Sequence, residues 1–66
     1  MKLHLNGEEK EITGASSVAE LVAALGLPAE TALVEHNGVA LHRSEWAGRT
    51  LSEGDQLEIL RIAAGG

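Results

Sequence analysis

The start of the chain alternates apolar and polar side chains. In MKLHL, residues 1–5, every second side chain is apolar, and this period of two predicts a strand with one buried face. Asn6-Gly7 follows and favours the type I′ turn of a hairpin, because both residues tolerate a positive φ. The returning strand, 8–13, is mostly charged, with Ile12 as its main apolar anchor. A charged strand suits the edge of a sheet, where it discourages pairing with other chains.

The pattern then changes to that of a helix, predicted over residues 17–25. Apolar side chains recur at the i, i+3, i+4 and i+7 positions of one helical stripe: Val18, Leu21, Val22 and Leu25. Ser17 and Glu20 are spaced as a capping box. Gly26 fits the left-handed position that ends a helix, and Pro28 prevents the helix from continuing.

The second half of the chain predicts another hairpin and one more strand. Asn37-Gly38 lies within ALVEHNGVALH, residues 32–42, and supplies the second hairpin turn. RSEWAGRTLSEGD, residues 43–55, has no strand pattern and is interpreted as a loop with a turn or short helix, ending in a tight turn at 53–55. LEILRI, residues 57–62, is the closing strand.

The order of these elements is hairpin, helix, hairpin, loop and strand. A chain of 66 residues with this order must lay its one helix across one face of the sheet. The predicted class is α+β, with a β-grasp fold of four to five strands in a mixed sheet. The last strand is expected beside the first, in parallel and at the centre. We expect a single domain, 1–66, with a C-terminal tail at 63–66.

The composition of the chain excludes several classes of function. A chain of 66 residues has a minimal core and no room for a deep pocket, and Trp46 is its only aromatic residue. The net charge of −5 argues against nucleic acid or an anionic membrane as partner but permits a partner with a basic rim. Without cysteine there is no disulfide, no thiolate ligand for zinc and no thiol nucleophile. No signal peptide or membrane-spanning run is apparent, so a soluble, cytoplasmic protein is expected.

No constellation of side chains predicts an active site. His4, His36 and His42 are scattered without ligand spacing, so surface or edge histidines are favoured over a metal site. The serines lack an evident base, and the ten carboxylates are interpreted as a solvated surface. We therefore expect no catalytic residue, no metal and no bound cofactor, which disfavours a small enzyme.

The closing strand carries large apolar residues on both faces. Alternation puts Leu57, Ile59 and Arg61 on one face and Glu58, Leu60 and Ile62 on the other. If the first set meets the helix, Leu60 and Ile62 point outward and, with Glu58, form a candidate docking patch. Scattered exposed residues, or residues covered by the loop around Trp46, are the alternatives.

The chain ends in Ala64, Gly65 and Gly66. A frayed end is one interpretation, since termini fray unless they are tied down. The functional interpretation is that the two glycines enter a narrow channel of a partner, because glycine has no Cβ and fits where other residues do not. The group delivered there is the Gly66 carboxylate, which is inert until it is activated, usually by adenylation with ATP. A partner enzyme must supply that step, because the chain has no nucleotide site.

Several motifs together resemble a known family. These are LHLNGEE at 3–9, SSVAELVAALGL at 16–27, HRSEW at 42–46, EGDQLEI at 53–59 and the terminal AAGG at 63–66. In order and spacing they are similar to the ThiS-type sulfur-carrier proteins of thiamine biosynthesis, over the whole chain. His42 stands where the family often has proline, and His36 where an aliphatic residue is more usual, so the second hairpin departs from the pattern.

The resemblance implies a ubiquitin-like carrier that is a monomer when free. A partner adenylating enzyme activates the Gly66 carboxylate with ATP, a persulfide donor supplies sulfur, and Gly66 becomes a thiocarboxylate. Gly65 and Ala64 thread the tail into the partner, and thiazole synthase accepts the sulfur. Two alternatives stay open: a MoaD-like small subunit of molybdopterin synthase, which tends to be longer and richer in phenylalanine, and a β-grasp interaction module without carrier function.

Overall fold

The two predicted hairpins form the two sides of one five-stranded sheet. The computed structural model describes residues 1–62, and its strands are β1 (Lys2–Leu5), β2 (Glu8–Glu11), β3 (Ala32–His36), β4 (Val39–Leu41) and β5 (Gln56–Arg61). The strand order is β2-β1-β5-β3-β4, with β5 parallel to β1 and antiparallel to β3. The closing strand therefore lies beside the first, in parallel and at the centre, as predicted.

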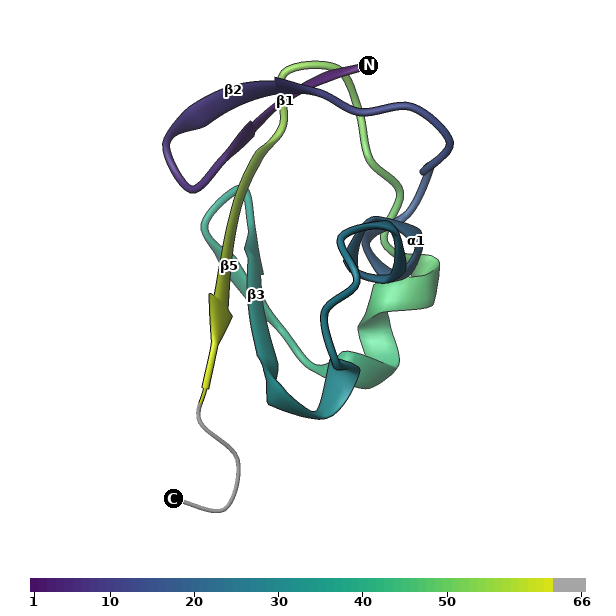
Figure 1. Ribbon diagram of the computed structural model, residues 1–66, viewed down its shortest axis with the longest axis vertical. Helices are drawn as coiled ribbons and strands as arrows, with labels where there is room; N and C mark the ends of the chain where they lie inside the picture. The colour runs from purple at the N-terminus through teal and green to yellow at the C-terminus, as the bar shows by residue number, and fades with distance from the viewer. Residues whose placement is uncertain (63–66) are drawn as a thin grey trace.

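Helical segments cover one side of this sheet. They are the α-helix α1 (Val18–Ala24) and the 3₁₀ helices η1 (Ala29–Thr31) and η2 (Arg43–Gly48). Figure 1 shows α1 and η2 on the same side of the sheet, which is the predicted β-grasp arrangement. The loop expected at 43–55 contains η2, in agreement with the short helix allowed there. No helix within residues 1–62 is long and apolar enough to span a membrane.

Both predicted hairpin turns have the expected backbone. The φ angles are 52° and 81° at Asn6-Gly7 and 51° and 84° at Asn37-Gly38. A positive φ at both central residues belongs to a type I′ turn, whose twist matches that of the flanking strands. The two Asn-Gly pairs therefore fix the positions of both hairpins from local sequence alone.

The asparagine side chains of these turns also reach β5, which the local pattern does not show. The Asn6 amide donates to the Ile59 carbonyl at 3.1 Å and accepts from the Ile59 N–H at 2.7 Å. The Asn37 side-chain oxygen accepts from the Gln56 N–H at 2.8 Å. Each turn is thus tied to the central strand as well as to its own hairpin, which helps to hold β5 between the two hairpins.

Helix α1 begins at the predicted cap with one change of partner. The Ser17 hydroxyl accepts from the Glu20 N–H at 3.2 Å. The Glu20 carboxylate accepts from the N–H and the hydroxyl of Ser16, at 2.7 and 2.8 Å, rather than from the N–H of Ser17. These bonds hold the pKa of Glu20 below its usual value. The reciprocal pairing of a capping box is therefore present but reaches one residue further back.

The helix ends at Gly26 as predicted. Gly26 has a φ of 73°, and the N–H groups of Gly26 and Leu27 donate to the carbonyls of Ala23 and Val22, the bonds of a Schellman motif. The expectation that Leu25 belongs to the buried stripe is wrong, because Leu25 is 39% exposed. It occupies the C-cap position, beyond the last helical residue.

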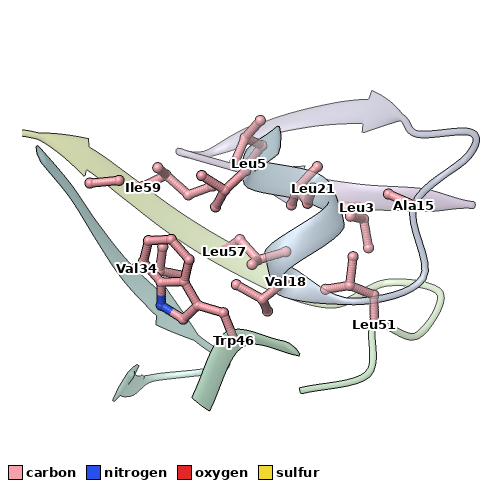
Figure 2. Close-up of a cluster of buried hydrophobic side chains, with 12 residues drawn as sticks. Leu3, Leu5, Ala15, Val18, Leu21, Val34, Trp46, Leu51, Leu57 and Ile59 are labelled. Carbon is pink, nitrogen blue, oxygen red and sulfur yellow. The ribbon is translucent and has the colours of Figure 1, made fainter. Parts of the chain in front are cut away.

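The core lies between α1 and the sheet. Its largest fully buried side chains are Leu3, Val18, Leu21 and Leu57. Figure 2 shows these residues converging from β1, α1 and β5, with Trp46 entering from η2. Strand β2 lies at the sheet edge with all four residues exposed, as its charges predicted. It ends before Ile12, which packs partly buried against the core.

The predictions for Ala64, Gly65 and Gly66 lie outside the described residues. The structure describes the chain as far as Ile62, whose N–H donates to the Thr31 carbonyl at 2.7 Å. This bond attaches the last described residue to Thr31, at the end of η1.

Candidate partner-docking surface

Strand β5 separates its apolar residues as predicted. Leu57 and Ile59 are buried under α1, whereas Leu60 is 60% exposed and Ile62 is 47% exposed. Trp46 is buried in the core on the helix-covered side and does not cover them. The exposed pair therefore lies on the open face of the sheet, which α1 does not cover.

Leu33 extends this apolar surface onto β3. It is 51% exposed and is the direct cross-strand partner of Leu60. Sequence reasoning missed Leu33, although a signal was present. In ALVEH, residues 32–36, alternation places Leu33 and Glu35 opposite to the buried Ala32, Val34 and His36.

Two glutamates lie next to the leucine pair. Glu58 of β5 is exposed, as expected for a docking residue, and its cross-strand partner on β3 is the exposed Glu35. Within residues 1–62 neither carboxylate forms an ion pair. We call Leu33, Glu35, Glu58, Leu60 and Ile62 the open-face patch.

The open-face patch borders a shallow hollow. Its volume is about 200 Å³, and its lining comes from β3, β4 and β5: Leu33, Val34, Glu35, Ala40, Leu41, Glu58 and Leu60. An exposed apolar hollow with charged residues at its rim is typical of a surface that contacts another molecule. It is too small and too open to enclose a nucleotide.

The expectation that His36 is a surface or edge histidine is wrong. His36 is only 5% exposed and points into the helix-covered side. Its Nε2 lies 2.6 Å from the Asp55 carboxylate, and its Nδ1 accepts from the Arg49 Nε–H at 2.8 Å. Because arginine can only donate, Nδ1 carries no proton and Nε2–H donates to Asp55. Both ring nitrogens are occupied, so His36 has a structural role rather than that of a metal ligand or base.

Asp55 is the centre of this cluster. It also accepts from the Asn37 side chain at 3.1 Å and from the Ser52 N–H at 2.8 Å. Burial alone raises the pKa of Asp55, but the hydrogen bonds from His36, Asn37 and Ser52 outweigh it and hold the pKa below its ordinary value of 3.8. The cluster joins the second hairpin to the turn before β5.

The remaining histidines are exposed. His4 lies on β1 and His42 precedes η2, where its N–H donates to the Glu45 carboxylate at 2.7 Å. Within residues 1–62 no group of three histidine, aspartate or glutamate side chains could hold a metal ion. Among the described residues, the open-face patch is the candidate surface for contact with another molecule.

Comparisons with known proteins agree with the predicted resemblance. The sequence model of the ThiS family matches residues 3–66. Two curated thiazole synthases, from Paramagnetospirillum magneticum and Magnetococcus marinus, are 35% and 33% identical over 66 residues, which is 100% of this chain and 20% of each relative. The chain therefore spans about a fifth of the length of these relatives.

Solved structures extend the similarity to the fold. The crystal structure of the thiamine biosynthesis protein ThiS from Geobacter metallireducens has a TM-score of 0.82 and 39% identity, with 100% of both chains covered. A solution structure of a thiamine biosynthesis protein from that organism has a TM-score of 0.81 and 39% identity, covering 100% of this chain and 88% of the other. The chain belongs to the ThiS family.

Proposed function

We propose that this protein is the sulfur carrier of thiazole formation in thiamine biosynthesis. The observation that carries the proposal is the match to the ThiS family over residues 3–66, together with full-length structural similarity to a ThiS protein. The carrier is a protein co-substrate rather than an enzyme. Its reacting group is the α-carboxylate of Gly66, which a partner adenylating enzyme activates.

The chemistry requires little of the domain beyond its terminus. A Gly66 carboxylate oxygen attacks the α-phosphorus of ATP on the adenylating enzyme, and pyrophosphate leaves. The terminal sulfur of a persulfide donor then attacks the acyl carbon and AMP leaves. A thiol reduces the resulting sulfur–sulfur bond, which leaves Gly66 as a thiocarboxylate. The chain itself binds no cofactor in this scheme, and ATP belongs to the partner.

The position of the exposed apolar residues along the sequence, close to Gly66, supports this assignment. Leu60 and Ile62 are exposed at the end of β5, immediately before residues 63–66. We therefore propose that a partner which binds residues 63–66 also contacts Leu60 and Ile62. Ala64 and Gly65 are proposed to pass through the partner's channel, since small residues and glycine fit a narrow passage.

Thiazole synthase is the proposed acceptor of the sulfur. Two curated thiazole synthases each contain a segment similar to this whole chain. In each of those proteins one polypeptide contains both a segment similar to this chain and the rest of the thiazole synthase. This favours an association between this chain and a thiazole synthase. The thiamine assignment of the solved relatives favours this acceptor over molybdopterin synthase.

Intact-mass measurement after reconstitution tests the proposal. The protein is incubated with a candidate adenylating enzyme, ATP and a persulfide donor, and we expect the mass gain of one oxygen replaced by sulfur. Gly65→Val and a variant with one residue added after Gly66 provide the comparison. The added residue moves the carboxylate by about 3.5 Å, and both variants are expected to fold normally yet gain no sulfur.

The outcome separates the carrier from a plain interaction module. If the extended variant acquires sulfur as fast as the parent, Gly66 is not the reacting residue. If the parent is never adenylated but binds a protein through the open-face patch, the interaction-module hypothesis replaces the carrier.

A further inference from the structure

The open-face patch contains a feature that folding does not explain. Glu35 and Glu58 are direct partners on antiparallel strands, and side chains in such positions have Cβ atoms about 5 Å apart. Like charges directly opposite each other destabilise a sheet. Within residues 1–62 neither carboxylate has an ion-pair partner that would offset this cost.

The cation nearest in sequence does not neutralise the pair. Arg61 belongs to β5, but its cross-strand partner is the buried Ala32. Cross-strand partners share a face, so Arg61 lies on the side of the sheet opposite to Glu35 and Glu58. The two carboxylates are left facing solvent at the rim of the hollow.

The hollow places an apolar surface beside the two negatively charged carboxylates. Leu33 and Leu60 form the cross-strand pair next to the two glutamates, and all four residues line the hollow with Ala40 and Leu41 of the β4 edge. A ligand that satisfies both parts must carry a positive group and an aliphatic portion together.

We propose that the open-face patch is the docking site for an arginine of the adenylating enzyme, an inference that rests on the proposed function. The guanidinium lies between Glu35 and Glu58, and the methylene stem and a neighbouring aliphatic side chain fill the hollow. Arginine fits best because its planar group has five donors and bonds two carboxylates at once. Its stem covers apolar surface while its head stays polar.

The charges of the reacting groups favour the adenylating enzyme over thiazole synthase as the partner that supplies this arginine. An enzyme that brings a carboxylate to the α-phosphorus of ATP surrounds that site with cations, because ATP and the carboxylate are both negative. The entrance to such a site is complementary to a carrier of net charge −5 that exposes two carboxylates without an ion-pair partner in residues 1–62.

The first part of the test uses the free protein. Glu35→Gln, Glu58→Gln and the double variant are compared with Glu8→Gln, which removes one charge at the far edge strand β2, where Glu8 lies 3.7 Å from Lys10. We expect the urea midpoint of unfolding of the first three variants to stay unchanged or rise. A fall in the midpoint would overturn the inference, because the pair would then be stabilising the fold.

The second part measures ATP–pyrophosphate exchange by the adenylating enzyme with the full chain as co-substrate. Each of Glu35→Gln and Glu58→Gln is expected to raise the KM for the carrier about tenfold with kcat unchanged. Glu8→Gln is expected to leave both constants unchanged. The KM of the wild type should also rise more steeply with salt than that of the double variant, since the contact is electrostatic. Equal constants for all variants would overturn the inference.

Two further outcomes separate this inference from the proposed function. If the wild type is adenylated and the glutamine variants match it, but these variants transfer sulfur slowly to thiazole synthase, the carrier function stands and the assignment to the adenylating enzyme is wrong. If the wild type itself supports no exchange and gains no sulfur, both are overturned.

Discussion

Strands β3 and β5 present two unlike faces made by alternate residues of the same segments. On the helix-covered face, Val34, Leu57 and Ile59 are buried in the core. On the open face, Leu33 and Leu60 are similar in kind but more than half exposed. Hydrophobic residues at adjacent positions thus differ in how much they contribute to the stability of the fold, because only one face of the sheet has another layer of structure packed on it.

The polar residues of the two faces differ in the same way. The buried His36 has a partner for each ring nitrogen, Asp55 and Arg49. The exposed Glu35 and Glu58 face each other without an ion-pair partner in residues 1–62. On the helix-covered face the polar groups bond to each other and stabilise the fold. On the open face the two carboxylates are free to form an ion pair with another molecule.

The largest effect should come from truncating leucines on opposite faces of β5. Leu57→Ala is expected to cost about 2–5 kcal/mol, because it removes a fully buried side chain and leaves a cavity. Leu60→Ala is expected to cost less than about 1 kcal/mol, because its side chain is exposed. Urea unfolding of both variants makes the measurement. Equal losses would show that the two faces do not differ energetically.

A smaller effect is expected from the buried polar cluster. His36→Ala should destabilise the protein by about 1–3 kcal/mol, since it leaves the Asp55 carboxylate and the Arg49 guanidinium without their shared partner. His4→Ala, on an exposed position of β1, is the control and should stay within about 0.5 kcal/mol of the wild type. A neutral His36→Ala would mean that the cluster is not needed for stability.

The pH dependence of stability gives a third test of the inner face. The pKa of Asp55 is lowered in the folded state, so the unfolded chain binds more protons in the acid range. The stabilisation is complete above the unfolded pKa of about 3.8 and is lost as the pH falls through the folded pKa. Unfolding midpoints measured down through this range should fall more steeply for the wild type than for Asp55→Asn. Parallel curves would assign the acid sensitivity to other carboxylates, such as Glu11 and Glu20, whose pKa values are also lowered.

The smallest effect on stability is expected on the open face. Leu60→Arg should change the free energy of unfolding by no more than about 0.5 kcal/mol, because the side chain packs against no second layer. Binding to the proposed adenylating enzyme should nevertheless weaken, since a cation on this chain repels the cation proposed for that partner. The pair of measurements is urea unfolding and the KM for the carrier. A variant that unfolds easily yet binds normally would reverse the roles of the two faces.

Local sequence determined much of this architecture. Asn6-Gly7 and Asn37-Gly38 place both hairpins, and Ser17 and Gly26 place the ends of α1, because these residues act through backbone angles and hydrogen bonds within a few positions. The alternation of residues 57–62 separated the buried from the exposed side chains of the closing strand. The family resemblance was also readable from short motifs in order along the chain.

Only the tertiary structure decided which distant residues share a face or a cluster. His36, Arg49 and Asp55 are brought together although 13 and 19 positions separate His36 from its two partners. The pairing of Leu33 with Leu60, and of Glu35 with Glu58, depends on the register between β3 and β5. That register follows from burying one face of each strand against α1, a requirement of the whole core that no single segment expresses.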